Sequence, residues 1–332
     1  MLSVRSPRRR PVPILVGVLT VLAVAAALLW QPVFTREDRP SGSVTLSTGV
    51  TTGVYARYGQ LLRGQLARDA PGLEMTLAPS VGSVENIRRL VAGEADFAIA
   101  TADALATYQA TGGEGAERLR ACARLYDDYL QLVVPAGSAV RETADLAGLR
   151  VGVGQDGSGV QLVTRELLAA AGLDMEADVR AVREGINDMP RMLEAGRIDA
   201  FFWSGGLPTN AVTRLAARLD IRLVPLGDLL PALSGRGPHS DFYRAAVMPP
   251  DAYPDIAGSD VIDTIAVANL LVTTEESDDA LTEQITRSVI NGRDRIGQEV
   301  HAAQRVDLRT AIYTRPLELH PGARAYYRSA KV

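Results

Sequence analysis

The feature that most constrains the fold is an internal repeat. Residues 82–96 are GSVENIRRLVAGEAD and residues 185–199 are GINDMPRMLEAGRID, and the two segments align without a gap, with Gly, Arg, Leu, Ala, Gly and Asp coinciding. Each copy is typical of a glycine loop, an amphipathic helix that ends at a glycine, and a turn with an aspartate before a buried strand. Because this arrangement is common in α/β proteins, the alignment alone leaves chance similarity open.

A second match, upstream of the repeat, favours true duplication. In both halves a strand leads into a loop of Gly, Ser or Thr and then into a helix, at residues 46–55 and 153–160. The alternation of short β-rich runs with amphipathic runs predicts an α/β protein with two similar lobes. The expected elements are Ser43–Ser47, Tyr55–Arg68, Leu73–Ala78, Glu85–Ala92 and Phe97–Ala100 in the first lobe, and Arg150–Val153, Gln161–Ala171, Val179–Val182, Asp188–Ala195 and Ala200–Trp203 in the second.

Two further β-rich runs are expected to cross between the lobes. The apolar run Tyr129–Val134 leads from the first series to the second, and Asp263–Thr273 leads back to a helix over Asp278–Gln298. Two crossing strands form a hinge. We therefore assign residues 41–133 and 263–332 to lobe 1, where the segment through Tyr326 and Tyr327 packs, and residues 134–262 to lobe 2.

The first forty residues differ from the rest. Four arginines, between Arg5 and Arg10, precede an uncharged stretch from Pro11 to Phe34. Its apolar part, residues 14–30, is long enough to span a membrane as a helix, and the positive flank predicts a cytoplasmic N-terminus. We expect residues 1–40 to comprise an N-terminal transmembrane or signal helix, either an uncleaved anchor or a cleaved signal peptide, with Thr35–Ser43 as linker. The remainder is then extracytoplasmic, held to the membrane by this helix or secreted after cleavage.

Composition excludes several classes of function. The net charge of −4 comes from mixed acids and arginines, so no basic surface for nucleic acid is expected. The single cysteine, Cys122, excludes an internal disulfide and a cysteine-rich metal site. Residues 152–157 match the dinucleotide pattern Gly-x-Gly-x-x-Gly, but no acidic residue follows at the expected place. The three histidines lack metal-ligand spacing and lie far from the glycine loops, so we expect neither cofactor, metal nor enzyme activity.

Four loops rich in Gly, Ser and Thr are the candidate binding site. They span Thr48–Gly53, Ser80–Ser83, Gly154–Gly159 and Ser204–Thr209, and each lies before a helix. Ligands of open α/β sheets bind at the carboxyl ends of strands, where N–H groups of helix N-termini favour an anion such as a carboxylate.

Each residue singled out also has a purely structural interpretation. Ser83 and Ser158 could be helix N-caps, and the glycines could serve tight turns. Tyr55 could lie in the core or donate a hydrogen bond to a ligand, and Asp103 could cap a helix or bind a ligand ammonium. Only their occurrence at equivalent loops of both halves favours binding.

Eight short motifs occur in order along the chain: Ser47–Tyr55, Gly82–Asn86, Ala92–Ile99, Gly157–Gly159, Gly196–Phe202, Gly206–Pro208, Tyr253-Pro254 and His320–Gly322. Taken together, these motifs resemble those of the TAXI family of solute-binding subunits of TRAP-type transporters. The resemblance implies a type II periplasmic-binding-protein fold with a two-strand hinge, a small organic acid or amino acid such as glutamate or glutamine as ligand, and a TRAP-type permease as partner. Two departures, Thr51-Thr52 in place of a Gly-Gly pair and Val160 in place of a threonine, leave the ligand open.

The glycine loops and the resemblance together define the predicted ligand-binding set. It comprises Thr52, Gly53, Tyr55, Ser83, Asn86, Asp103, Gly157, Ser158, Gly159 and Gly206. The alternative is a membrane-tethered sensor domain that reports its ligand to a signalling partner. An enzyme on the same fold would need a catalytic His, Lys or carboxylate pair in the loops, which contain no His or Lys.

Overall fold

A computed structural model describes residues 40–256 and 261–330. The predicted signal or anchor helix and most of the linker lie outside the described residues. No helix within the described part of the chain is long and apolar enough to cross a membrane.

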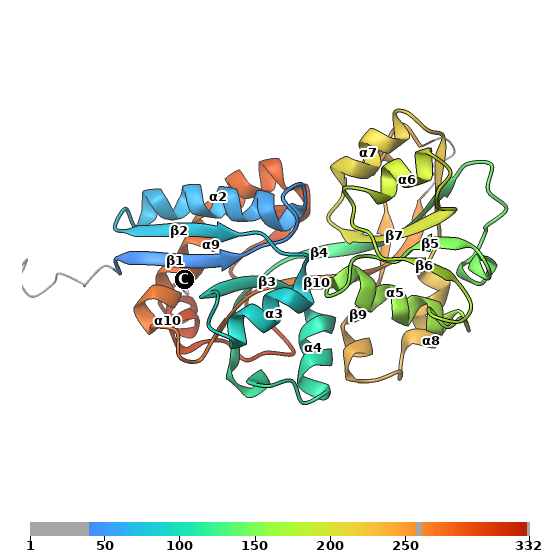
Figure 1. The fold of residues 1–332 in the computed structure, drawn as a ribbon. Coiled ribbons are helices and arrows are strands. Elements are labelled where there is room, and N and C mark those ends of the chain that lie inside the picture. Colours follow the sequence, from blue (N-terminus) through green and yellow to red (C-terminus); the bar gives the residue numbers. More distant parts are fainter. Residues whose placement is uncertain (1–39, 257–260, 331–332) are drawn as a thin grey trace, which may run out of the picture. The chain divides into compact units, whose positions relative to one another are not determined.

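The first lobe is built on three parallel strands. Strand β1 lies between β2 and β3, and its residues Val44 and Leu46 are fully buried. Helices α2, α9 and α10 pack on one face of the sheet, and α3 and α4 cover the other (Figure 1). The elements are β1 (Gly42–Ser47), α2 (Val54–Asp69), β2 (Leu73–Ala78), α3 (Ser83–Val91), β3 (Phe97–Thr101), α4 (Ala102–Ala110), α9 (Asp279–Glu299) and α10 (Pro321–Ser329).

The second lobe repeats this plan. Strand β5 lies between the parallel strands β6 and β7, as β1 lies between β2 and β3. Helices α5 and α8 lie on one side of these strands and α6 and α7 on the other (Figure 1). The elements are β5 (Arg150–Gly152), α5 (Gly159–Ala170), β6 (Arg180–Val182), α6 (Met189–Glu194), β7 (Ala200–Gly205), α7 (Asn210–Ala216), β8 (Ile221–Val224), α8 (Leu230–Leu233) and β9 (Tyr243–Met248).

The repeated aspartates have the same function in both lobes. A side-chain oxygen of Asp96 accepts a hydrogen bond from the backbone N–H of Thr45 at 2.7 Å, and one of Asp199 accepts from the N–H of Arg150 at 2.8 Å. The glycine that ends each preceding helix has a left-handed backbone, with φ of +72° at Gly93 and +62° at Gly196. The repeated segments therefore form equivalent structures.

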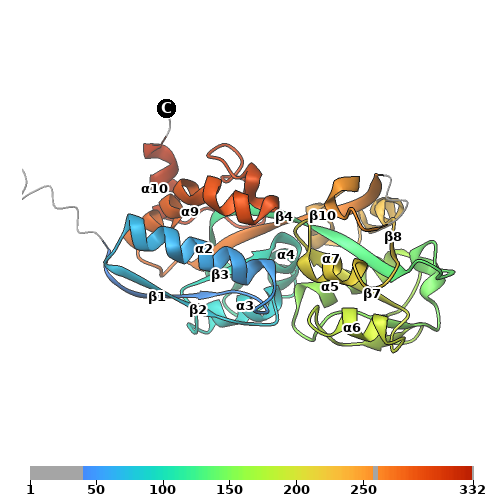
Figure 2. The same ribbon diagram turned by 90° about the horizontal axis from the view of Figure 1, so that it is seen from above.

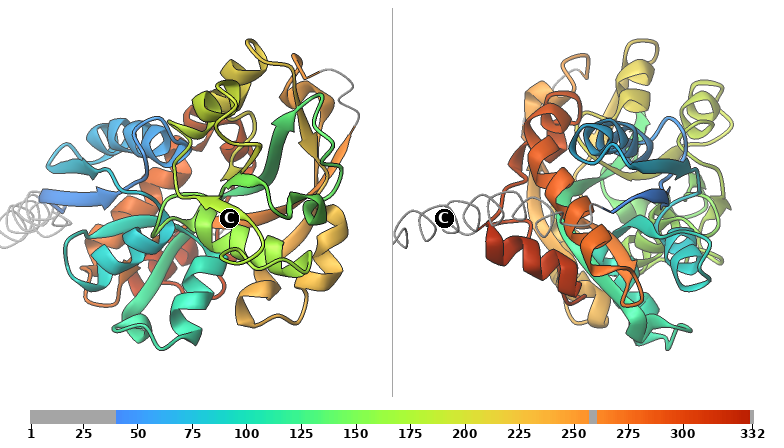
Figure 3. Two further views of the ribbon diagram at one scale, coloured as in Figure 1. Left: turned by 45° about the vertical axis from the view of Figure 1, so that its right-hand side comes forward. Right: turned by 90° about the vertical axis from the view of Figure 1, so that its left-hand side faces the viewer.

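Two long antiparallel strands, β4 (Leu119–Pro135) and β10 (Ile262–Thr274), join the lobes (Figures 2 and 3). The sheet order is β2-β1-β3-β10-β4-β7-β5-β6, so the two crossing strands lie at its centre, and β8 and β9 pair with them at the side. Tyr126 packs in the core of the first lobe and Leu130 in that of the second, and Leu271 and Val267 divide in the same way. The chain therefore passes from one lobe to the other in the middle of each strand, a few residues from the predicted lobe limits at residues 133/134 and 262/263.

The predicted start of the first crossing strand, Tyr129, was wrong. Strand β4 begins ten residues earlier, at Leu119. Its first part is mostly apolar and buried but includes Arg120 and Arg124, which are half-buried and form ion pairs. These arginines interrupt the apolar run, so this part of the strand lacks the continuously apolar pattern of Tyr129–Val134.

Candidate functional site

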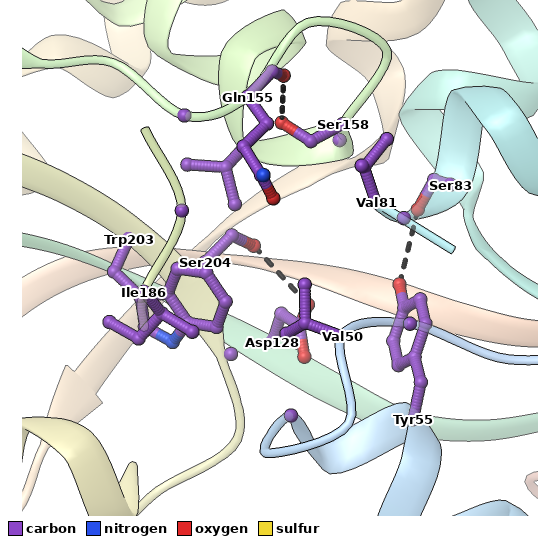
Figure 4. A pocket seen from close by; sticks show the side chains of 18 of the residues that line it. Val50, Tyr55, Val81, Ser83, Asp128, Gln155, Ser158, Ile186, Trp203 and Ser204 are labelled. Carbon is purple, nitrogen blue, oxygen red and sulfur yellow. Dashed lines mark hydrogen bonds between the residues drawn. The ribbon is translucent and has the colours of Figure 1, made fainter. Parts of the chain in front are cut away.

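A cavity of about 60 Å³ lies where the two lobes meet. It is lined by the residues that begin α2 and α3 in the first lobe and α5 in the second, together with residues of β4 and β7 (Figure 4). A cavity of this size in the closed state suits a small solute.

Two separate hydrogen-bonded groups lie at the floor of the cavity, and each includes one residue of a crossing strand. The hydroxyl of Tyr55 lies 3.1 Å from that of Ser83 and donates to Oδ1 of Asn269 on β10. On β4, Oδ2 of Asp128 accepts a hydrogen bond of 3.3 Å from the hydroxyl of Ser204 (Figure 4). The floor therefore couples the hinge to both walls.

Burial sets the ionisation of two groups on this floor. It raises the pKa of Asp128 to about 7, and the amide of Asn269 and hydroxyl of Ser204 only partly oppose the rise. Burial also raises the pKa of Tyr55 well above its usual value, and the nearby carboxyl of Asp128 adds to the effect. Tyr55 is therefore a neutral hydroxyl, whereas Asp128 changes charge near neutral pH.

Three helix N-termini form the walls. Helices α2 and α3 begin after Gly53 and Gly82, which have no side chain to cap the first turn, while Ser158 caps α5 by accepting from Gln161 N–H at 3.1 Å. The first N–H groups of a helix lack partners within the helix and carry a partial positive charge. The walls therefore favour a negatively charged group of a ligand.

The lobes touch around the cavity. The backbone N–H of Glu85 in α3 donates to the carbonyl of Gly157 at 3.1 Å. A Cβ atom added at Gly159 would lie 3.0 Å from Oγ of Ser83, so only glycine permits this approach without displacement. Across the cavity, the hydroxyl of Thr52 bonds to Asn187. The described conformation is therefore closed.

Half of the predicted set lines the cavity. These residues are Gly53, Tyr55, Ser83, Ser158 and Gly159. Gly157 and Thr52 do not line the cavity. They join the two lobes beside it, Gly157 by its bond to Glu85 and Thr52 by its bond to Asn187. Gly206 lines a neighbouring groove with Pro208 and His301.

Asn86 and Asp103, predicted as ligand contacts, are instead bonded within the protein. The side-chain amide of Asn86 donates to the carbonyl of Thr48, just after β1, and to that of Ile99 within β3. Asp103 accepts from the N–H of Ala104 at 2.8 Å and from the hydroxyl of Tyr243 at 2.9 Å. Both side chains are at most 1% exposed and are not among the residues that line the cavity, so their observed bonds hold elements of the protein together.

Asp128 is the lining residue of greatest chemical interest that sequence reasoning missed. The predicted crossing strand began at Tyr129 and therefore did not include Asp127 and Asp128. The pair of adjacent aspartates could have indicated this residue. Side chains of adjacent strand residues point to opposite faces, so one of Asp127 and Asp128 must face the interior of the protein.

A family model described as the NMT1-like family matches residues 46–330, nearly all of the described chain. The chain belongs to this family. The finer assignment to the TAXI family stays a prediction.

Solved structures show that this NMT1-like chain has the predicted two-lobed periplasmic-binding-protein fold. A protein of Bordetella bronchiseptica RB50 is 19% identical with a TM-score of 0.53, over 87% of this chain and 80% of its own. The alkanesulfonate-binding protein SsuA from Xanthomonas axonopodis pv. citri, bound to MOPS, is 16% identical with a TM-score of 0.50, over 87% and 84%. An ancestral arginine-binding protein bound to arginine is 15% identical with a TM-score of 0.50, over 78% and 98%.

A buried bond between the lobes of this NMT1-like protein gives a first prediction. Tyr243 on β9 donates to Asp103 on α4, and replacing Tyr243 with phenylalanine leaves a buried carboxylate oxygen without this donor. We expect the free energy of unfolding to fall by about 1–3 kcal/mol, measured by urea denaturation. Tyr108→Phe removes a hydrogen bond to Glu114 at the surface and should cost less. Equal losses in the two variants would show that the interlobe bond contributes no more to stability than a hydrogen bond at the surface.

Proposed function

We propose that this NMT1-like protein is an extracytoplasmic receptor that captures a small carboxylate or amino acid between its lobes. The observation that carries the proposal is the cavity at the hinge, whose walls are helix N-termini of both lobes. A solute held there contacts both lobes, so it favours the closed over the open state. The fold, shared with sulfonate- and arginine-binding proteins, supports a binding function rather than catalysis.

The proposed receptor delivers its solute to a membrane permease of the TRAP type, as the resemblance to the TAXI family implies. We further propose that the N-terminal segment places residues 40–332 outside the cytoplasm. A sensor domain is the alternative, favoured by the interpretation of the N-terminal segment as an uncleaved anchor. A permease gene beside the receptor gene supports transport, and a signalling gene supports the sensor.

A thermal-shift screen tests the proposal directly. The full chain, in a mild detergent, is screened against amino acids, small carboxylates and small sulfonates. A solute at a hundred times its Kd should stabilise the folded state by about 2.7 kcal/mol. The shift should shrink in Ser83→Ala and Tyr55→Phe, because both hydroxyls lie on the cavity.

Matched controls are Ser43→Ala and Tyr313→Phe, which alter exposed residues away from the cavity. They should leave the shift unchanged. A folded protein that no compound of the three classes stabilises would overturn the proposal, as would shifts that the cavity variants leave intact.

A further inference from the structure

The cavity contains one charged side chain. Among the described residues that line it, Asp128 is the sole acid, and there is no Lys, Arg or His. Asp128 is 4% exposed, and although Oδ2 accepts from Ser204, Oδ1 has no hydrogen-bond partner within the described residues. A buried carboxylate oxygen without a partner is costly, so it marks a place where a ligand can supply the missing donor.

The groups around Asp128 do not neutralise its charge. The charged residues that act on it are Asp127 and Asp103, which are themselves acidic. The amide of Asn269 interacts with Asp128 and lowers its pKa, but within the described residues its nitrogen makes no hydrogen bond of ordinary geometry, and its oxygen accepts from Tyr55. The arginines nearest in sequence and sheet register pair with Asp127 instead, on the other face of β4.

The walls of the cavity favour a negatively charged group, whereas Asp128 on the floor favours a positively charged one. The first turns of α2 and α3 have no side-chain cap and favour an anion, although the N–H of Glu85 in α3 already donates to Gly157, while the floor carries a carboxylate. A solute that bears only a carboxylate would satisfy the walls but would repel an ionised Asp128. A solute with both a carboxylate and an ammonium group matches both ends, since an ammonium supplies three hydrogen-bond donors for Asp128 and neighbouring hydroxyls.

Building on the proposed function, we infer that Asp128 binds the ammonium group of the solute. The receptor therefore selects amino acids over carboxylic acids and sulfonates that lack an amino group. Asp128 is the specificity-determining residue of the site, and its position on the crossing strand β4 places the ammonium at the hinge.

Isothermal titration calorimetry on the full chain tests this assignment. The probes are the twenty common amino acids and, for the tightest binder, the same carboxylic acid with hydrogen in place of the amino group. We expect removal of the amino group to raise Kd at least about 30-fold, because the ion pair with Asp128 is lost. Asp128→Asn should weaken the amino acid by a similar factor while leaving the deaminated acid unchanged or bound more tightly.

Two controls separate recognition from a general loss of structure. Asp127→Asn makes the same chemical change one residue away, on the face of β4 that forms surface ion pairs, and should leave both affinities unchanged. Binding of the amino acid to the unaltered chain at pH 6 should also release about one proton, because an ammonium stabilises the ionised form of Asp128. Titrations in buffers of different ionisation enthalpy measure this release without any variant.

Different results would contradict the role of Asp128 and the proposed receptor function. Equal affinity for the amino acid and its deaminated form, or an Asp128→Asn variant that loses both equally, overturns the role of Asp128 and leaves the receptor intact. If neither amino acids nor their deaminated forms bind the folded protein, the role of Asp128 and the proposed receptor function are both contradicted. If Asp128→Asn does not fold, two measurements on the unaltered chain still test the role of Asp128. These are the affinity for the deaminated acid and the release of a proton on binding.

Discussion

Replacing Gly159 with leucine is expected to raise the Kd of the solute found in the screen at least about 100-fold. Gly159 begins α5, and a Cβ atom there would lie 3.0 Å from Oγ and 3.3 Å from Cβ of Ser83 in the opposite lobe. A leucine side chain would occupy the space where the lobes meet, so the solute would lose its contacts with one wall. Because its φ is not positive, Gly159 can be replaced without backbone strain, and the lobes should fold normally.

The matched control is Gly137→Leu, since a Cβ atom at Gly137 meets nothing within 4 Å. Titration calorimetry gives the affinity, and small-angle X-ray scattering with and without solute shows whether the lobes close. We expect the radius of gyration of Gly159→Leu to stay at its open value when solute is added. Unchanged affinity in Gly159→Leu would mean that binding does not require the observed approach of the lobes.

The contribution of Asp128 to the free energy of unfolding should fall as pH rises from about 4 to about 7. Its pKa is raised from 3.8 to about 7 by burial, so the folded state binds a proton that the unfolded state releases. The stabilisation is fully present below the unfolded pKa and is lost as pH rises through the folded pKa. A shift of this size corresponds to about 4 kcal/mol, as an order of magnitude.

The variant Asp128→Asn isolates this contribution, because other groups titrate in both proteins. Near pH 4 the two proteins should have similar free energies of unfolding, and near pH 8 the variant should be more stable by about 4 kcal/mol. Urea denaturation without solute, over this pH range, measures the difference. A difference that does not depend on pH would mean that Asp128 ionises normally in the folded protein.

Much of the fold could be predicted because its signals are local. Helix α2 was predicted at Tyr55–Arg68 and spans Val54–Asp69, and β2 was predicted at its observed bounds. Periodic apolar residues and terminal glycines specify such elements within a few residues of chain. The repeat then indicated two similar lobes, since the same local signals occurred twice in the same order.

The sequence by itself therefore determined the α/β class, the duplicated plan and the glycine loops that border the cavity. Only the tertiary structure decided which polar side chains face that cavity. Asn86 and Asp103 lie next to predicted loops in the sequence. However, Asn86 is hydrogen-bonded to Thr48 and Asp103 to Tyr243, and both partners are distant in sequence. Asp128 faces the cavity because β4 begins at Leu119 and pairs with β7 and β10, contacts that no local pattern encodes. Burial and charge at a site depend on such long-range pairing, because desolvation is a property of all the surrounding elements together.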